Sequence, residues 1–129
     1  MTNNLFKMTS NISGAFYILC TAVVLGCVLA IPYLRGAARR WPWPVGALHG
    51  ALGAVGLAAL LLVLQHGLPT SSMGTAGFVP AAAVLLGIAL LLGLVIGVRR
   101  RRPPGVLMAV HASVAIAGFV VLWTVVSLG

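Results

Sequence analysis

Two histidines lie inside long apolar stretches of the sequence, and their side chains are the ones best suited to chemistry there. His49 follows Pro42 by seven residues, and His111 follows Pro104 by seven residues. Imidazole is a good ligand for transition metals, and a polar residue inside a membrane is costly and usually functional. No Cys, Asp or Glu stands near either histidine, so the pair alone does not complete a zinc or non-haem iron site.

The two histidines also correspond to each other in an internal repeat. A shift of 62 residues, the difference between positions 49 and 111, lays the second half of the chain on the first. The matching positions are Arg39 with Arg101, Arg40 with Arg102, Pro42 with Pro104, His49 with His111, Gly56 with Gly118 and, more weakly, Phe16 with Phe78. This pattern predicts two related helical hairpins.

The remaining reactive side chains are two thiols and a third imidazole. Cys20 and Cys27 are seven residues apart, which places them on one helix face but too far apart to form a disulfide with each other. We expect them to be small core residues, and without a C-x-x-C pair a disulfide-generating enzyme is not supported. His66 is expected at a helix end in the membrane interface, and a quinone or proton contact is the alternative.

Composition sets the class of protein that must position these residues. Of 129 residues, 61% are hydrophobic and 6% are charged, with eight Lys plus Arg and no Asp or Glu. An average soluble domain of this length has roughly 16 acidic residues, so an ordinary soluble protein is excluded. The high hydrophobicity excludes disorder, and the lack of a polar surface excludes a nucleic-acid binder. The sequence therefore predicts a multi-spanning protein of the lipid bilayer.

Four stretches are long enough to cross the hydrocarbon core, which takes about 20 apolar residues. They cover residues 14–34, 44–64, 76–98 and 106–128. The expected fold is all-α: one integral membrane domain, residues 1–129, forming an up-down-up-down four-helix bundle. Its two tandem hairpins are expected to be related by a pseudo-two-fold axis along the membrane normal. Residues 1–13 lack a basic segment and a cleavage motif, so the first span is expected to be retained.

The positive charges predict the orientation of the bundle. Seven of the eight Lys and Arg residues lie in the first and third connections, and Lys7 is the eighth. Because cytoplasmic loops collect Lys and Arg, both of these connections are expected in the cytoplasm and both termini outside. The bacterial inner membrane is the expected location.

The bundle would bring His49 and His111 face to face. The second and fourth spans run in the same direction and are diagonal in such a bundle. Both imidazoles lie about 10 Å beyond the aligned Pro, at the same depth. Haem iron needs only two axial ligands because the porphyrin supplies the other four. The residues therefore predict one haem b with His49 and His111 as its axial ligands.

Small residues and arginines near the two histidines in the sequence also fit the prediction of a bound haem. A flat macrocycle needs small residues beside it, and haem propionates need cations. The expected cofactor-binding residues are Gly46, Gly53, Gly56, Ala115, Gly118, Arg39, Arg40, Arg101 and Arg102. The glycines equally suit close helix packing, and the arginines equally suit anionic lipid.

Paired histidines on alternate helices, with small residues one or two turns away, resemble the small b-type cytochromes. Examples are the four-helix core of the cytochrome b561 type and the haem-bearing membrane anchors of respiratory oxidoreductases. The resemblance covers residues 39–64 and 101–126 and implies an electron carrier or a subunit of a redox complex rather than an enzyme by itself. It also implies quinone, partner subunits or a homo-oligomer as partners. Di-haem members need four histidines; with three, this chain is expected to bind one haem.

Two other functions remain open. A non-catalytic structural or assembly subunit would use both histidines as unrelated buried imidazoles, each hydrogen-bonded to a neighbouring backbone group or hydroxyl. A small transporter is disfavoured, because four-helix exporters couple to protons through a membrane carboxylate and the sequence has none.

Overall fold

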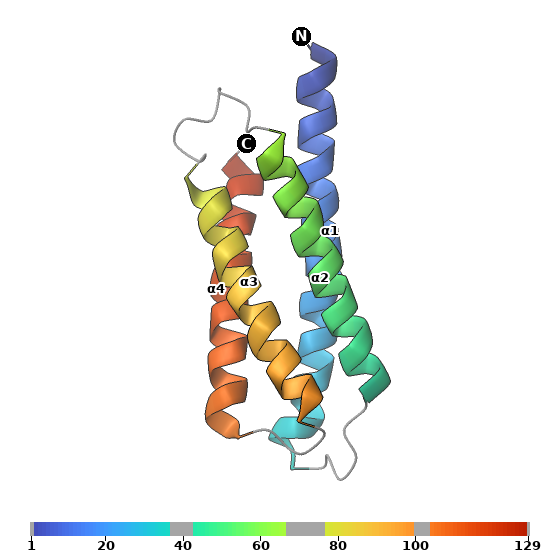
Figure 1. Cartoon of the computed structure of the whole chain (residues 1–129), viewed down its shortest axis with the longest axis vertical. Helices are drawn as coiled ribbons and strands as arrows, with labels where there is room; N and C mark the ends of the chain where they lie inside the picture. Colours follow the sequence, from blue (N-terminus) through green and yellow to red (C-terminus); the bar gives the residue numbers. More distant parts are fainter. Residues whose placement is uncertain (1, 37–42, 67–76, 100–103, 129) are drawn as a thin grey trace.

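The computed structural model describes residues 2–36, 43–66, 77–99 and 104–128, and within these ranges the chain forms four helices (Figure 1). They are α1 (Thr2–Leu34), α2 (Trp43–Gln65), α3 (Phe78–Val98) and α4 (Gly105–Leu128). All four are long and apolar enough to cross a membrane. The predicted all-α four-helix fold is confirmed.

Hydrophobicity accounts for the helix boundaries, because backbone groups in lipid must be satisfied within the helix itself. The apolar spans are Ile12–Leu34, Trp43–Gln65, Phe78–Val98 and Gly105–Leu128, each boundary within two residues of the expected one. Helix α1 extends further, since it begins at Thr2. It ends where Gly36 adopts a left-handed φ of 66°, which glycine tolerates best. At the start of α4, the carbonyl oxygen of Pro104 accepts a hydrogen bond from the N–H of Met108, at 3.2 Å.

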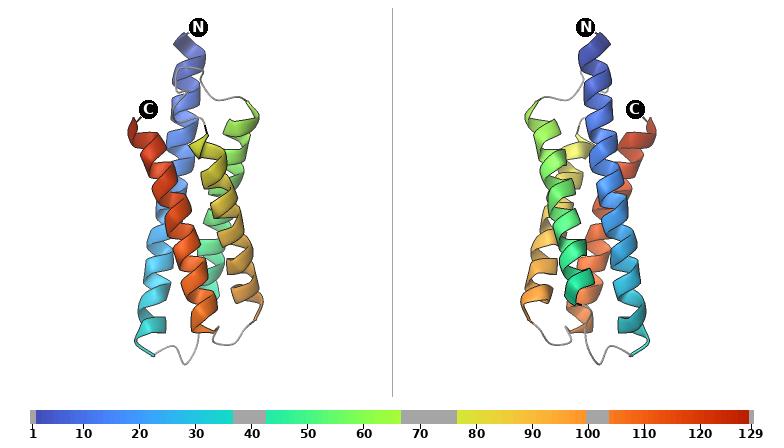
Figure 2. Two further views of the ribbon diagram at one scale, coloured as in Figure 1. Left: turned by 90° about the vertical axis from the view of Figure 1, so that its left-hand side faces the viewer. Right: turned by 90° about the vertical axis from the view of Figure 1, so that its right-hand side faces the viewer.

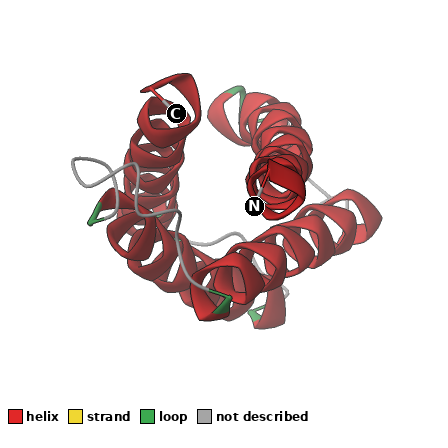
Figure 3. Ribbon diagram, turned by 90° about the horizontal axis from the view of Figure 1, so that it is seen from above, coloured by secondary structure: helices red, strands yellow, loops and turns green. Residues whose placement is uncertain are grey.

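The helices form two hairpins arranged around a common centre (Figures 2 and 3). Helix α1 packs most extensively against α2, and α3 against α4; the α2–α3 and α1–α4 contacts are smaller. Among the described residues, no close backbone approach joins α1 to α3 or α2 to α4. The second and fourth helices are thus diagonal, as expected from an up-down-up-down order. Both termini lie at one end, here called the terminal end (Figure 1); the opposite end, near Arg35 and Arg99, is called the arginine end.

Most of the buried core lies in the terminal half of the bundle, with Leu29 of α1 in the other half, and it repeats between the hairpins. Its largest fully buried side chains are Leu60, Leu122 and Val79. The buried residues of α2 are Gly56, Leu60 and Val63, and those of α4 are Gly118, Leu122 and Val125, each 62 positions later. The predicted repeat therefore recurs in the packing of α2 and α4.

The first and third helices follow a different register. Ala15, Leu19 and Ala22 are buried in α1, and their counterparts Ala82, Leu86 and Ala89 are buried in α3, each 67 positions later. The predicted match of Phe16 with Phe78 is therefore not the structural one, since Phe16 corresponds to Ala83. The five-residue difference arises because α3 extends three residues less beyond Ala89 than α1 does beyond Ala22, and the connection that follows is two residues shorter.

Most of each span faces outward. Only 11% to 22% of the residues in the four apolar windows are buried inside the bundle. The exposed side chains include Val24, Leu62, Leu91 and Val120. Such a surface is compatible with lipid, in agreement with the predicted integral multi-pass membrane protein.

Candidate functional site

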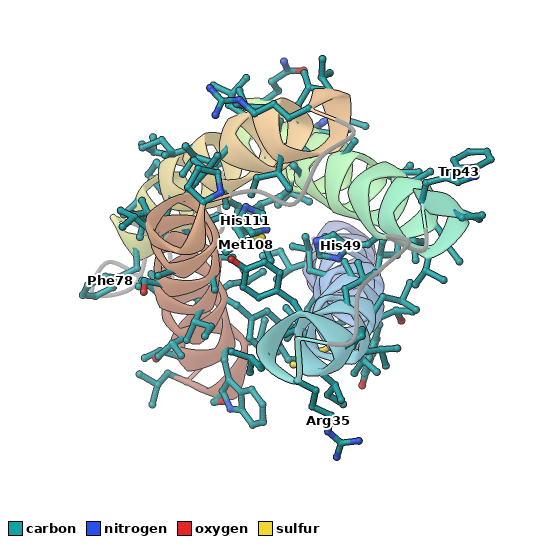
Figure 4. All side chains as sticks on the ribbon, turned by 90° about the horizontal axis from the view of Figure 1, so that it is seen from below. Arg35, Trp43, His49, Phe78, Met108 and His111 are labelled. Atoms are coloured by element: carbon teal, nitrogen blue, oxygen red, sulfur yellow. The ribbon has the colours of Figure 1, made fainter. Side chains whose placement is uncertain are left out.

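His49 and His111 meet between the diagonal helices. Their ring centres are 6.1 Å apart, and the ring planes are inclined by 82° to each other. Both residues are half-buried. Seen from the arginine end, both side chains point toward the centre of the bundle, whereas Arg35, Trp43 and Phe78 point outward (Figure 4). The structure thus brings together the two residues that the sequence predicts as metal ligands.

Each imidazole is held by the helix that precedes it in its own hairpin. His49 Nδ1 lies 2.7 Å from the carbonyl oxygen of Ala22 in α1, and His111 Nδ1 lies 2.9 Å from that of Ala89 in α3. A carbonyl can only accept a hydrogen bond, so Nδ1 carries the proton and donates it. In the neutral imidazole, the other ring nitrogen, Nε2, then carries no proton and can bind a metal.

These two hydrogen bonds alone do not distinguish a metal ligand from a structural histidine. A backbone hydrogen bond is what the structural interpretation predicts as well. The two rings lie 6.1 Å apart at 82°, a geometry that ordinary edge-to-face aromatic contacts also adopt. Equivalent bonds to Ala22 and Ala89, 67 positions apart, show that both hairpins build the same local structure.

Two glycines that the sequence reasoning missed make this arrangement possible. A Cβ added to Gly26 would lie 3.1 Å from His49 Cε1, and one added to Gly93 would lie 3.0 Å from His111 Cε1. Glycine lets the imidazole ring lie directly against the neighbouring helix backbone. The only signal in the sequence is a shared spacing, since each glycine follows its alanine, Ala22 or Ala89, by four residues.

The predicted small residues divide into two groups. Gly56 faces α1, where an added Cβ would lie 2.6 Å from Leu19 Cγ, and Gly118 faces α3, where it would lie 3.0 Å from Leu86 Cγ. These two glycines therefore serve close helix packing, the alternative that the sequence left open. Gly53, which lies near Leu90, is half-buried, as are Gly46 and Ala115.

In the arginine half of the bundle, α1 contributes the buried residue Leu29, whereas α2 and α4 contribute none. The buried residues of α2 begin at Gly56 and those of α4 at Gly118, so no described residue on the histidine-bearing halves of these helices is buried. Met108, three residues before His111, also points toward the centre there (Figure 4). The sequence reasoning missed this side chain, which stands where the first hairpin has Gly46. The histidines thus lie next to the packed core but outside it.

The other predicted residues lie apart from the pair or outside the described ranges. Arg39, Arg40, Arg101 and Arg102 are outside the described residues. His66 is exposed, and its Nδ1 bonds the Leu62 carbonyl of its own helix at 2.7 Å. Cys20 and Cys27 are free thiols, Cys20 half-buried and Cys27 exposed, so the expectation that both are core residues is wrong. In the described part of the chain, no three His, Cys, Asp or Glu side chains group to hold a metal ion.

Comparison with known proteins gives no relative from which a function could be transferred. No family, no curated protein and no solved structure matches the chain.

Proposed function

We propose that the protein is a membrane-embedded b-type cytochrome that binds one haem between His49 and His111 and transfers electrons. The observation that carries this proposal is the separation of the two rings. With a metal–nitrogen bond of about 2 Å and about 1.2 Å from nitrogen to ring centre, imidazoles on opposite sides of one metal have centres about 6.4 Å apart. The measured separation is 6.1 Å.

The donor chemistry of the site also fits. Two imidazoles with their Nδ1–H groups bonded to backbone carbonyls have the second hydrogen bond typical of metal-bound histidine. A bare ion would need further ligands, which the described residues do not group together. Haem requires only these two side chains.

The lack of buried residues on α2 and α4 beside the pair supports a bulky group rather than a small one. The buried core ends at Gly56 and Gly118, and the histidine-bearing halves of α2 and α4 contribute no buried residue to it. Arg39, Arg40, Arg101 and Arg102 are the proposed partners of the propionates, with Gly46, Gly53 and Ala115 as small residues near the macrocycle. Gly56 and Gly118 are assigned to helix packing instead.

The haem would supply reversible one-electron chemistry, and the chain would hold and insulate it. His49 and His111 would fix the iron through Nε2, while the carbonyls of Ala22 and Ala89 orient the rings. Such a carrier needs no carboxylate, consistent with the absence of Asp and Glu from the sequence. The proposed redox partner is quinone or a partner subunit, in the bacterial inner membrane with the arginine end in the cytoplasm.

The test is an absorption spectrum of the purified full-length protein in detergent, supplied with haem. Reduction is expected to give a sharp α-band near ~560 nm, typical of a six-coordinate b-type haem. His49→Ala and His111→Ala should each abolish that band, and His66→Ala, at an exposed imidazole bonded within its own helix, is the matched control. A protein that stays colourless with excess haem overturns the proposal.

The alternative is a structural or assembly subunit without a cofactor. The observation that favours it is the same pair of Nδ1 hydrogen bonds, which satisfies each imidazole without a metal. On this alternative, His49→Ala and His111→Ala leave the assembly and activity of the parent complex unchanged, and no pigment is bound by the wild-type chain.

A further inference from the structure

We propose that α1 and α3 hold the two imidazole planes nearly perpendicular, and that this sets the electronic type of the iron between them. The inference rests on the proposed haem function and deepens it. It assigns a positioning role to the Ala22 carbonyl with Gly26 and to the Ala89 carbonyl with Gly93. None of these four positions was expected to belong to the site.

Each ring is fixed at two points on the neighbouring helix. The backbone carbonyl receives the Nδ1–H, at 2.7 Å for His49 and 2.9 Å for His111. One turn further along the same helix, the glycine lies against Cε1, where an added Cβ would be 3.1 Å away in α1 and 3.0 Å away in α3. A hydrogen bond at one atom and a steric contact at the next restrict rotation of the ring about its bonds.

We call the carbonyl and glycine contacts on each ring its clamp. Because the two hairpins are symmetric, the two clamps together determine the angle between the ring planes. The clamps are equivalent, because Ala22 and Gly26 correspond to Ala89 and Gly93 in the 67-residue register. A two-fold axis along the membrane normal makes two equivalent rings perpendicular only if each plane is inclined by about 45° to that axis. The observed angle of 82° is close to this condition. Rotation of one ring changes the angle between the two imidazole planes. An equal, symmetry-related rotation of both rings changes that angle by twice as much.

Perpendicular axial imidazoles have a spectroscopic consequence. Parallel imidazole planes interact with the same iron d orbital and separate it in energy from its partner. Perpendicular planes interact with one orbital each, so the two orbitals stay close in energy. Ferric low-spin iron then gives a strongly anisotropic electron paramagnetic resonance signal with one very large g value, instead of the rhombic signal of near-parallel imidazoles.

The test is the electron paramagnetic resonance spectrum of the oxidised, haem-loaded, full-length protein in frozen detergent solution. The inference predicts the large-g signal. A rhombic low-spin signal from a protein that retains its ~560 nm band when reduced overturns the inference and leaves the proposed function standing. A protein without that band overturns the proposed function itself, so the two failures are distinguishable.

Substitutions then test the clamp. Gly26→Ala and Gly93→Ala should each retain the α-band and move the large g value toward the rhombic type by similar amounts, and the double variant should move it by about the sum. Gly14→Ala and Gly97→Ala are matched controls on α1 and α3, because an added Cβ there meets nothing within 4 Å. An unchanged g value in both Gly26→Ala and Gly93→Ala contradicts the positioning role, as does an equal shift in the controls.

Discussion

At the scale of single residues, the protein places very few polar side chains among its apolar helices and satisfies them through the backbone. The imidazoles of His49 and His111 donate to carbonyls of the adjacent helix, and Thr21 and Thr124 bond carbonyls of their own helices at 3.0 Å. An unsatisfied polar group in lipid costs several kcal/mol, so each of these bonds is needed whatever the function. What distinguishes the histidines is that each retains a second ring nitrogen for a ligand.

The thiols provide a prediction at this scale, because thiolate is the other strong metal ligand in the sequence. No three Cys and His side chains group together in the described part of the chain, so we expect Cys20→Ser and Cys27→Ser to leave the absorption spectrum of the haem-loaded protein unchanged. The measurement is the reduced spectrum of both single variants and of the double variant. A shifted or missing α-band in any of them would indicate sulfur ligation and a different site.

At the scale of helices, the histidine pair was predictable and its clamp was not. Matching positions in the repeat place His49 and His111 at one depth on diagonal helices, whatever the rotation of each helix. The contact of Gly26 with His49 depends instead on which face of α1 meets α2. A helix that is apolar on all sides has no polar stripe to indicate that face, so the sequence pattern does not specify it. The same uncertainty explains why Gly56 and Gly118 could be expected beside a cofactor although they face Leu19 and Leu86.

Helix packing at Gly118 gives the second prediction. An added Cβ there would lie 3.0 Å from Leu85 Cβ and 3.2 Å from the Leu86 backbone nitrogen, neither of which is the end of a flexible side chain. We expect Gly118→Ala to destabilise the bundle by about 1–3 kcal/mol, the usual cost of overpacking. Thermal unfolding in detergent, followed by circular dichroism, measures the effect.

Gly97→Ala is the control for this substitution. Its added Cβ meets nothing within 4 Å, and alanine is the better helix former by up to about 1 kcal/mol. It should therefore leave the unfolding temperature unchanged or raise it slightly. Equal unfolding temperatures for Gly118→Ala and Gly97→Ala would show that the close α3–α4 contact does not stabilise the bundle.

At the scale of the whole molecule, the bundle is polarised along its axis. The terminal half contains most of the buried core, including Leu60 and Leu122, and the other half contains the histidines. In the sequence, seven of the eight cationic residues fall between the first and second helices or between the third and fourth. The fold class and the four spans were predictable from hydropathy, because a helix that crosses the hydrocarbon core needs about 20 apolar residues. The concentration of buried residues in the terminal half depends on individual contacts, such as that of Leu19 with Gly56. Hydropathy does not predict such contacts.

Orientation in the membrane is the third prediction. The arginine end is expected in the cytoplasm and both termini outside, because Lys and Arg accumulate in cytoplasmic loops. The measurement is labelling of single introduced cysteines in intact cells with a membrane-impermeant maleimide, in a background lacking Cys20 and Cys27. A cysteine at Asn3 should react before lysis and one at Ala37, in the sequence between the first two spans, only afterwards. The reverse pattern would contradict this orientation.

The central claim is that His49 and His111 occupy both axial positions of one haem, and carbon monoxide tests it most directly. Ferrous haem binds carbon monoxide readily only where an axial position is open. The account predicts that the reduced, haem-loaded wild-type protein keeps its spectrum under carbon monoxide, while His49→Ala and His111→Ala, each with one position vacated, bind the gas and shift their spectra. A wild-type spectrum that shifts as fully as those of the variants, or a wild-type protein that takes up no haem, would contradict it.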